Sequence, residues 1–91
     1  MKTAAADLRA IERYIARDDP QIARAVVERL LVAGESLGSL PRKGRPHPIR
    51  WEPAARELAV GAYRIHYRIV KEGTLDEEVQ ILSVMHGRQQ Q

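Results

Sequence analysis

The chain has 91 residues, a formal net charge of +3, no cysteine, no phenylalanine and a single tryptophan. This length suits one domain over residues 1–91 with a thin core, for which we expect a partner chain to supply part of the stability. The missing cysteines exclude a disulfide scaffold, and no apolar run or signal-peptide core is long enough for membrane insertion or export. Composition therefore favours a cytoplasmic protein and permits nucleic-acid binding without requiring it.

The first half of the sequence predicts two helices. Leu8, Ile11 and Ile15 share one helical stripe, and this helix must end near Asp18-Asp19-Pro20, because the residue before a proline is driven out of the helical region. Asp19 can cap the next helix and Pro20 suits its first turn. The second helix carries apolar residues at spacings of three and four: Ile22, Val26, Leu30, Ala33 and Leu37. With Gly38 as terminator, the pair predicts an antiparallel hairpin over about residues 4–38.

Residues 41–53 form a predicted loop, because four prolines and Gly44 oppose regular structure. The segment 42–50 holds four basic side chains, one histidine and no acid. It is therefore either a solvated linker or a contact surface. Trp51 in this loop is either packed beneath it or an exposed anchor.

Alternating residues over about 56–86 predict antiparallel strands. A two-residue turn at Gly61-Ala62 sets Val60 opposite Tyr63, and so Glu57 opposite His66. Facing the helices would be Leu58, Val60, Tyr63, Ile65, Tyr67 and Ile69, with the tyrosines as core residues. The other face would carry Glu57, Arg64, His66 and Arg68. A turn near residues 72–74 leads to a last strand over about 78–85.

These elements predict an α+β fold, with an N-terminal helical hairpin packed on a three- to four-stranded antiparallel sheet. The cationic sheet face is suited to an anionic partner, either nucleic acid or an acidic protein segment. No metal site is predicted, because His47, His66 and His86 lie on different elements and lack the spacing of a closed site.

The ordered set of segments resembles the RelE/ParE toxin superfamily, and its form is more similar to the ParE branch than to the ribonuclease branch. The matching segments are 7–15, Gly44-Arg45-Pro46, Arg56-Glu57-Leu58, 63–68 and His86-Gly87-Arg88. This resemblance implies a type II toxin that inhibits DNA gyrase by binding, without catalytic residues or a cofactor. It also implies an antitoxin that neutralises the toxin and links it to operator DNA. Residues expected to bind the target or antitoxin are Arg45, Trp51, Arg64, Arg68, His86 and Arg88.

One departure from the family concerns the N-terminus, where members usually have a strand before the first helix. Residues 1–6 are a poor strand, so the strand is missing, is very short, or precedes a start site chosen downstream of the true one. A missing strand would leave a sheet edge open to a partner strand or to a second copy in a homodimer.

Two alternative functions remain at this stage. In a ribosome-dependent mRNA endonuclease, Arg64 would hold the phosphate, Glu57 or Glu52 would act as base, and His86 as acid. This chain lacks that branch's paired lysines and its C-terminal tyrosine or lysine, and Glu57 suits an ordinary cross-strand pair. The other alternative is a non-toxic chain that only binds antitoxin and operator DNA as a co-repressor.

Overall fold

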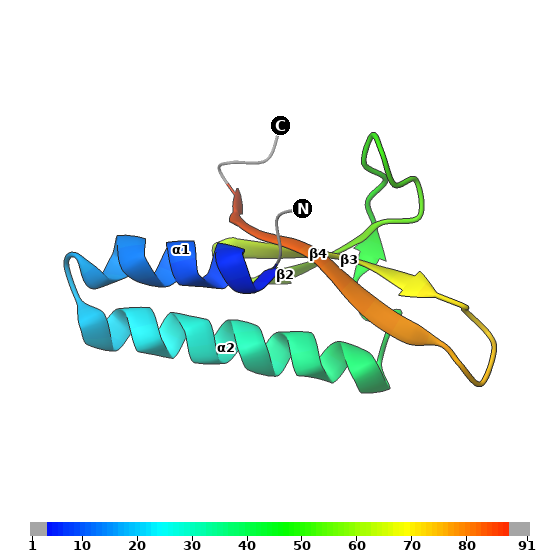
Figure 1. Ribbon diagram of the computed structural model, residues 1–91, viewed down its shortest axis with the longest axis horizontal. Coiled ribbons are helices and arrows are strands. Elements are labelled where there is room, and N and C mark those ends of the chain that lie inside the picture. The colour runs from blue at the N-terminus through cyan, green and yellow to red at the C-terminus, as the bar shows by residue number, and fades with distance from the viewer. Residues whose placement is uncertain (1–3, 88–91) are drawn as a thin grey trace.

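The computed structural model describes residues 4–87 and confirms the predicted α+β class. A helical hairpin is followed by a four-stranded antiparallel sheet whose strand order is the order in the chain (Figure 1). The elements are α1 Ala4–Ala16, α2 Pro20–Ser39, β1 Arg45–Pro46, β2 Arg56–Val60, β3 Tyr63–Val70 and β4 Glu78–His86. Among the described residues, neither helix has the length and apolar character that crossing a membrane requires.

The turn between the helices has the predicted chemistry. Asp19 is the N-cap of α2, and its Oδ1 accepts hydrogen bonds from the backbone N–H groups of Gln21 and Ile22 at 3.0 and 3.1 Å. Pro20 occupies the first helical position, where its missing N–H costs nothing. At the other end α2 extends slightly beyond prediction, because Gly38 lies in the last turn and the helix ends at Ser39.

The β2–β3 hairpin has the predicted register, with Val60 opposite Tyr63 and Glu57 opposite His66. Gly61 has a φ of +59°, a left-handed conformation that glycine adopts without steric penalty. The last strand also forms as expected, pairing with β3 along its whole length apart from one irregularity between His66 and Tyr67.

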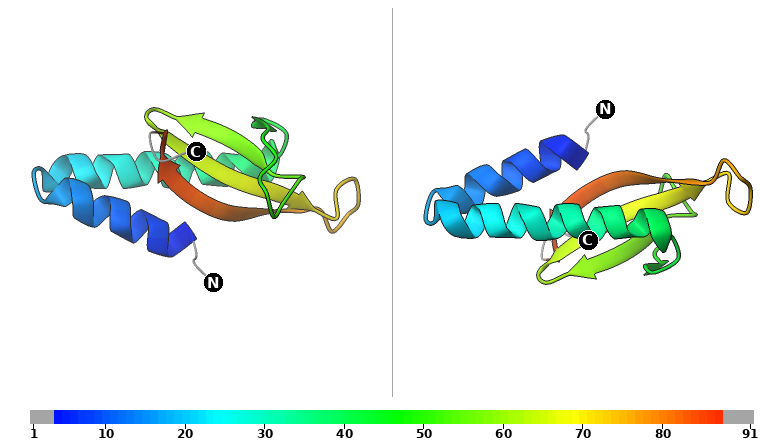
Figure 2. Two further views of the ribbon diagram at one scale, coloured as in Figure 1. Left: turned by 90° about the horizontal axis from the view of Figure 1, so that it is seen from above. Right: turned by 90° about the horizontal axis from the view of Figure 1, so that it is seen from below.

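The core lies between α2 and one face of the sheet. Figure 2 shows α2 running along this face, while α1 packs on α2 and beside β4. The buried apolar cluster comprises Leu30, Leu37, Ile65, Tyr67 and Val84. Tyr67 is fully buried, which confirms its predicted core role, whereas Tyr63 is only half-buried.

The basic loop is more ordered than its prolines suggested. We expected no regular structure over residues 41–53, but Arg45 and Pro46 form β1 and pair with Glu57 and Arg56 of β2. Proline is compatible with this position because β1 is a short edge strand. After β1 the chain continues as the irregular segment that rises beside the sheet in Figure 1, so the loop covers part of the sheet instead of hanging free.

The start of the loop is fixed by the buried Tyr67. Its hydroxyl donates a hydrogen bond to the Pro41 carbonyl at 2.6 Å and accepts one from the Gly44 N–H at 2.9 Å. Arg56 adds hydrogen bonds from its guanidinium to the Gly44 carbonyl at 2.8 and 3.1 Å. The core therefore positions the loop directly.

Residues 4–6 of the segment that could have held the family's first strand are helical, and residues 1–3 lie outside the described part. Within residues 4–87, β4 is an edge of the sheet with β3 as its strand neighbour.

Candidate functional site

Polar side chains gather around Glu57 on the sheet face opposite α2. The strand registers cause this, since Glu57 lies directly opposite His66 of β3 and opposite Arg45 of β1. The Glu57 side chain is only 2% exposed, and that of His66 only 5%. A carboxylate buried to this degree requires charged or hydrogen-bonding partners.

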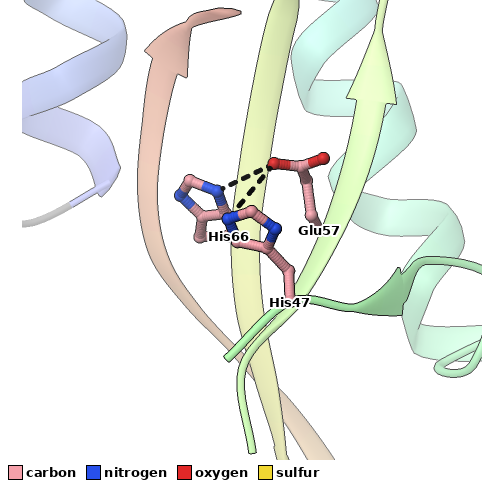
Figure 3. Close-up of side chains that lie close together, drawn as sticks. All are labelled: His47, Glu57 and His66. Carbon is pink, nitrogen blue, oxygen red and sulfur yellow. Dashed lines mark hydrogen bonds and ion pairs between the residues drawn. The ribbon is translucent and has the colours of Figure 1, made fainter. Parts of the chain in front are cut away.

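The two oxygens of Glu57 have different partners. Oε1 lies 3.0 Å from Arg45 Nη2 and 3.9 Å from Arg64 Nε. Oε2 lies 3.2 Å from His66 Nε2 and 3.7 Å from His47 Nε2, so both imidazoles point at one oxygen (Figure 3). Arginines therefore hold one side of the carboxylate and histidines the other.

His47 covers the cluster from the loop. Its ring stacks on that of His66 with centroids 5.1 Å apart and an interplanar angle of 10°. Its backbone N–H donates to the Ala55 carbonyl at 2.9 Å, which fixes the loop at this point. On its other side, the His66 ring places Nδ1 3.3 Å from Ser83 Oγ on β4.

The face predicted to carry Glu57, Arg64, His66 and Arg68 is partly covered. Glu57 and His66 are buried, because the loop folds over them. The cross-strand pair of Glu57 and His66 is confirmed. His47 was not foreseen as a partner; the only signal in the sequence was its place two residues after Arg45, at the end of what proves to be a strand.

The three residues of the nuclease alternative are engaged within the chain. Besides the contacts of Glu57, Arg64 Nη1 donates to the Gly61 and Tyr63 carbonyls at 3.1 and 2.9 Å. His86 lies opposite Tyr63 on β4 and packs edge-on against its ring, with centroids 5.3 Å apart.

Arg68 is paired with an acid of the loop. Its Nη1 lies 2.7 Å from Glu52 Oε2, and its Nε donates to Gln80 Oε1 at 2.8 Å. The hydrogen bond from Arg68, helped by one from the Ala54 N–H, lowers the pKa of Glu52 below its usual value. Glu52 is therefore held ionised, which suits an ion pair better than a general base working near neutral pH.

The remaining predicted contact residues lie on the surface or beyond the described chain. Trp51 is 68% exposed, so of the two alternatives the exposed position is correct. The side chain of Arg45 is 74% exposed although its tip reaches Glu57. Arg88 lies outside the described residues. Trp51 and Arg45 thus present an aromatic ring and a cation on the same loop.

We predicted no metal site because the three histidines lie on different elements. They do, but the fold brings His47 and His66 together. His47, Glu57 and His66 place one ligand atom each within 4.8 Å of one another. Two imidazole nitrogens and one carboxylate oxygen form a donor set that transition metals use in proteins.

Comparisons with known proteins agree with this architecture. The profile of the family described as "ParE toxin of type II toxin-antitoxin system, parDE" matches residues 1–91. The chain is also similar to a protein of Sinorhizobium fredii (strain NBRC 101917 / NGR234) named "Putative toxin Y4kP". The two are 40% identical in an alignment of 91 positions that covers 91% of this chain and 85% of that protein.

Proposed function

This chain belongs to the ParE toxin family of type II toxin–antitoxin systems, and we propose that it inhibits DNA gyrase by binding and is neutralised by a cognate antitoxin. Toxins of this family act within such modules, so an antitoxin is the expected partner. The proposal assigns the chain no reaction of its own.

The state of Glu57 is the observation that favours binding over mRNA cleavage. A general base must come within hydrogen-bonding reach of the proton that it removes. Both oxygens of Glu57 face side chains of the same protein, and the side chain is 2% exposed. A ribose hydroxyl would have to displace His47 and the loop to reach it. This supports a structural role for the carboxylate.

The loop offers the features of a binding surface. Tryptophan and arginine are the residue types that most often dominate the energy of an interface, especially when an aromatic ring fills a pocket of the partner. Trp51 and Arg45 are both exposed on this loop, six residues apart, and the loop backbone is held by hydrogen bonds at Gly44 and between His47 and Ala55. We expect Trp51 and Arg45 to contribute most to binding of the target or the antitoxin. Further candidates are Arg64, Arg68, His86 and Arg88.

A gyrase supercoiling assay with the purified chain tests the proposal, scored for lost supercoiling and for accumulated cleaved DNA. The wild-type chain should inhibit supercoiling by gyrase, and added antitoxin should restore gyrase activity. Trp51→Ala should inhibit more weakly. Tyr14→Ala is the matched control, because Tyr14 is an equally exposed aromatic residue (72%) on α1, and it should inhibit like the wild type.

The alternatives give other outcomes. A folded, antitoxin-binding chain without effect on gyrase would contradict the proposal. Cleaved mRNA in growing cells, left intact by Arg64→Ala, would then identify a ribosome-dependent nuclease. A chain that is harmless when expressed alone but binds antitoxin and operator DNA would identify a co-repressor.

A further inference from the structure

We propose that His47, Glu57 and His66 bind one divalent transition-metal ion with the preferences of zinc. Gyrase inhibition does not require such a site, so this inference is independent of the proposed function. It rests on the convergence of the three side chains at one point of the sheet (Figure 3).

Two of the spacings between ligand atoms are already close to those around a bound ion. Zinc bonds to nitrogen and carboxylate oxygen are about 2.0–2.2 Å long, which puts two ligands of a tetrahedral ion about 3.4 Å apart. The Nε2 atoms of His66 and His47 lie 3.2 and 3.7 Å from Glu57 Oε2. The three ligand atoms lie within 4.8 Å of one another, but the two imidazole rings are stacked nearly parallel. The His47 side chain on the loop must therefore turn for its nitrogen to face the same ion as that of His66, which requires no change of strand register.

The surrounding groups suit a ligand role. Ser83 Oγ lies 3.3 Å from His66 Nδ1, and a hydroxyl can accept a hydrogen bond from Nδ1–H, which leaves the Nε2 lone pair for a metal. The same hydroxyl can instead donate to Nδ1 when Nε2–H points at Glu57, so it supports both the empty and the loaded state. Arg45 holds Oε1 of Glu57 and leaves Oε2 to the ion.

The charges around the site determine which ions it favours. Arg45 and Arg64 approach the carboxylate and oppose a cation, so binding depends on the two imidazoles. Imidazole nitrogen favours zinc, cobalt, nickel and copper over magnesium and calcium, which prefer oxygen. Because the Arg45 side chain is 74% exposed, solvent screens much of its charge while it stays on Oε1.

His47 also provides access, since its side chain is 36% exposed while Glu57 and His66 are buried. The three protein ligands would leave a fourth position open on the side of the loop, for water or for a side chain of a partner. Because the ligands come from the loop, β2 and β3, the ion would fix the loop to the sheet and stabilise the folded chain.

Titration of the full chain, free of any affinity tag, with Zn²⁺ in a calorimeter tests the site, together with thermal unfolding in the presence and absence of Zn²⁺. The wild type should bind one ion per chain, and its Tm should rise. His47→Ala removes the most exposed ligand and should weaken binding at least tenfold and abolish the rise in Tm. Ser83→Ala should weaken binding about 10–100-fold by releasing the His66 ring.

His86→Ala is the matched control, because it removes the remaining histidine outside the cluster and should bind like the wild type. Circular dichroism of each variant establishes that it is folded. No heat of binding from the folded wild type would overturn the proposal, as would equal binding by His47→Ala. Co²⁺ provides a second readout, since an absorption spectrum typical of tetrahedral coordination should appear in the wild type and be lost in His47→Ala.

Discussion

Asp7 Oδ2 accepts a hydrogen bond from the backbone N–H of Val84 at 3.0 Å, with both residues buried. The carboxylate comes from the first turn of α1, and the N–H belongs to β4 at the edge of the sheet. A buried N–H on an edge strand needs a partner, and here a helix side chain supplies it in place of a neighbouring strand. The contact ties the first described element to the last.

Replacing Asp7 by alanine should lower the free energy of unfolding by about 1–3 kcal/mol, because the buried N–H of Val84 loses its acceptor. Asp7→Asn keeps an oxygen at the same place and should lower the free energy of unfolding by clearly less than Asp7→Ala does. Urea unfolding followed by circular dichroism measures both. Equal losses in the two variants would show that the charge, and not the hydrogen bond, matters.

Gly44 and Gly34 should respond to alanine with opposite signs. A Cβ on Gly44 would lie 2.7 Å from the Glu57 carbonyl oxygen and 2.6 Å from the Tyr67 hydroxyl, so Gly44→Ala should destabilise by about 1–3 kcal/mol. A Cβ on Gly34, within α2, meets nothing within 4 Å. Gly34→Ala should therefore stabilise by about 0.5–1 kcal/mol through helix propensity. Chemical denaturation compares the two variants, and a neutral Gly44→Ala would contradict this account of the loop.

Asp19→Ala should destabilise the protein by about 0.5–2 kcal/mol, because the N–H groups of Gln21 and Ile22 lose their cap. The adjacent Asp18 is exposed and serves as the control, so Asp18→Ala should have a much smaller effect. Thermal unfolding of the pair gives the comparison. Similar losses would indicate a general charge effect at the start of α2.

Glu52 should make stability depend on pH in the acid range. Its pKa is lowered in the folded state by the hydrogen bond from Arg68 and then by that from Ala54. A lowered folded pKa means that the ionised carboxylate stabilises the fold above its ordinary value of 4.5, and that this contribution is lost as the pH falls through the folded pKa. The stability gap between the wild type and Glu52→Gln should thus be constant near neutral pH and shrink below pH 4.5. Unfolding measured across this range checks the sign, and a gap that grows on acidification would contradict it.

The helices and the β2–β3 hairpin could be predicted because their signals are local. Asp19-Pro20 fixes a helix start, and a two-residue turn at Gly61-Ala62 leaves one register for the strands on either side. Periodicity then assigns each side chain to a face. Together these features determine most of the fold without any long-range information.

The candidate site could not be predicted in the same way. Alternation places Glu57 and His66 on the polar face, but it does not tell which other segment covers that face. The covering segment is the loop, and its position depends on hydrogen bonds between Tyr67 and the backbone at Pro41 and Gly44, which are distant in sequence. The proline-rich sequence of the loop gives no signal of these tertiary contacts, and so His47 was not expected beside Glu57.

The contact between Asp7 and Val84 also bears on how the protein is made. Pairing across 77 residues cannot form until β4 has been synthesised, so the core between the helices and the sheet closes only after all four strands have been made. While the chain is still growing, the hairpin of α1 and α2 exposes the apolar face that β3 and β4 will cover. The loop that Tyr67 holds at Pro41 and Gly44 rests on this core, so its final position also depends on the last strand.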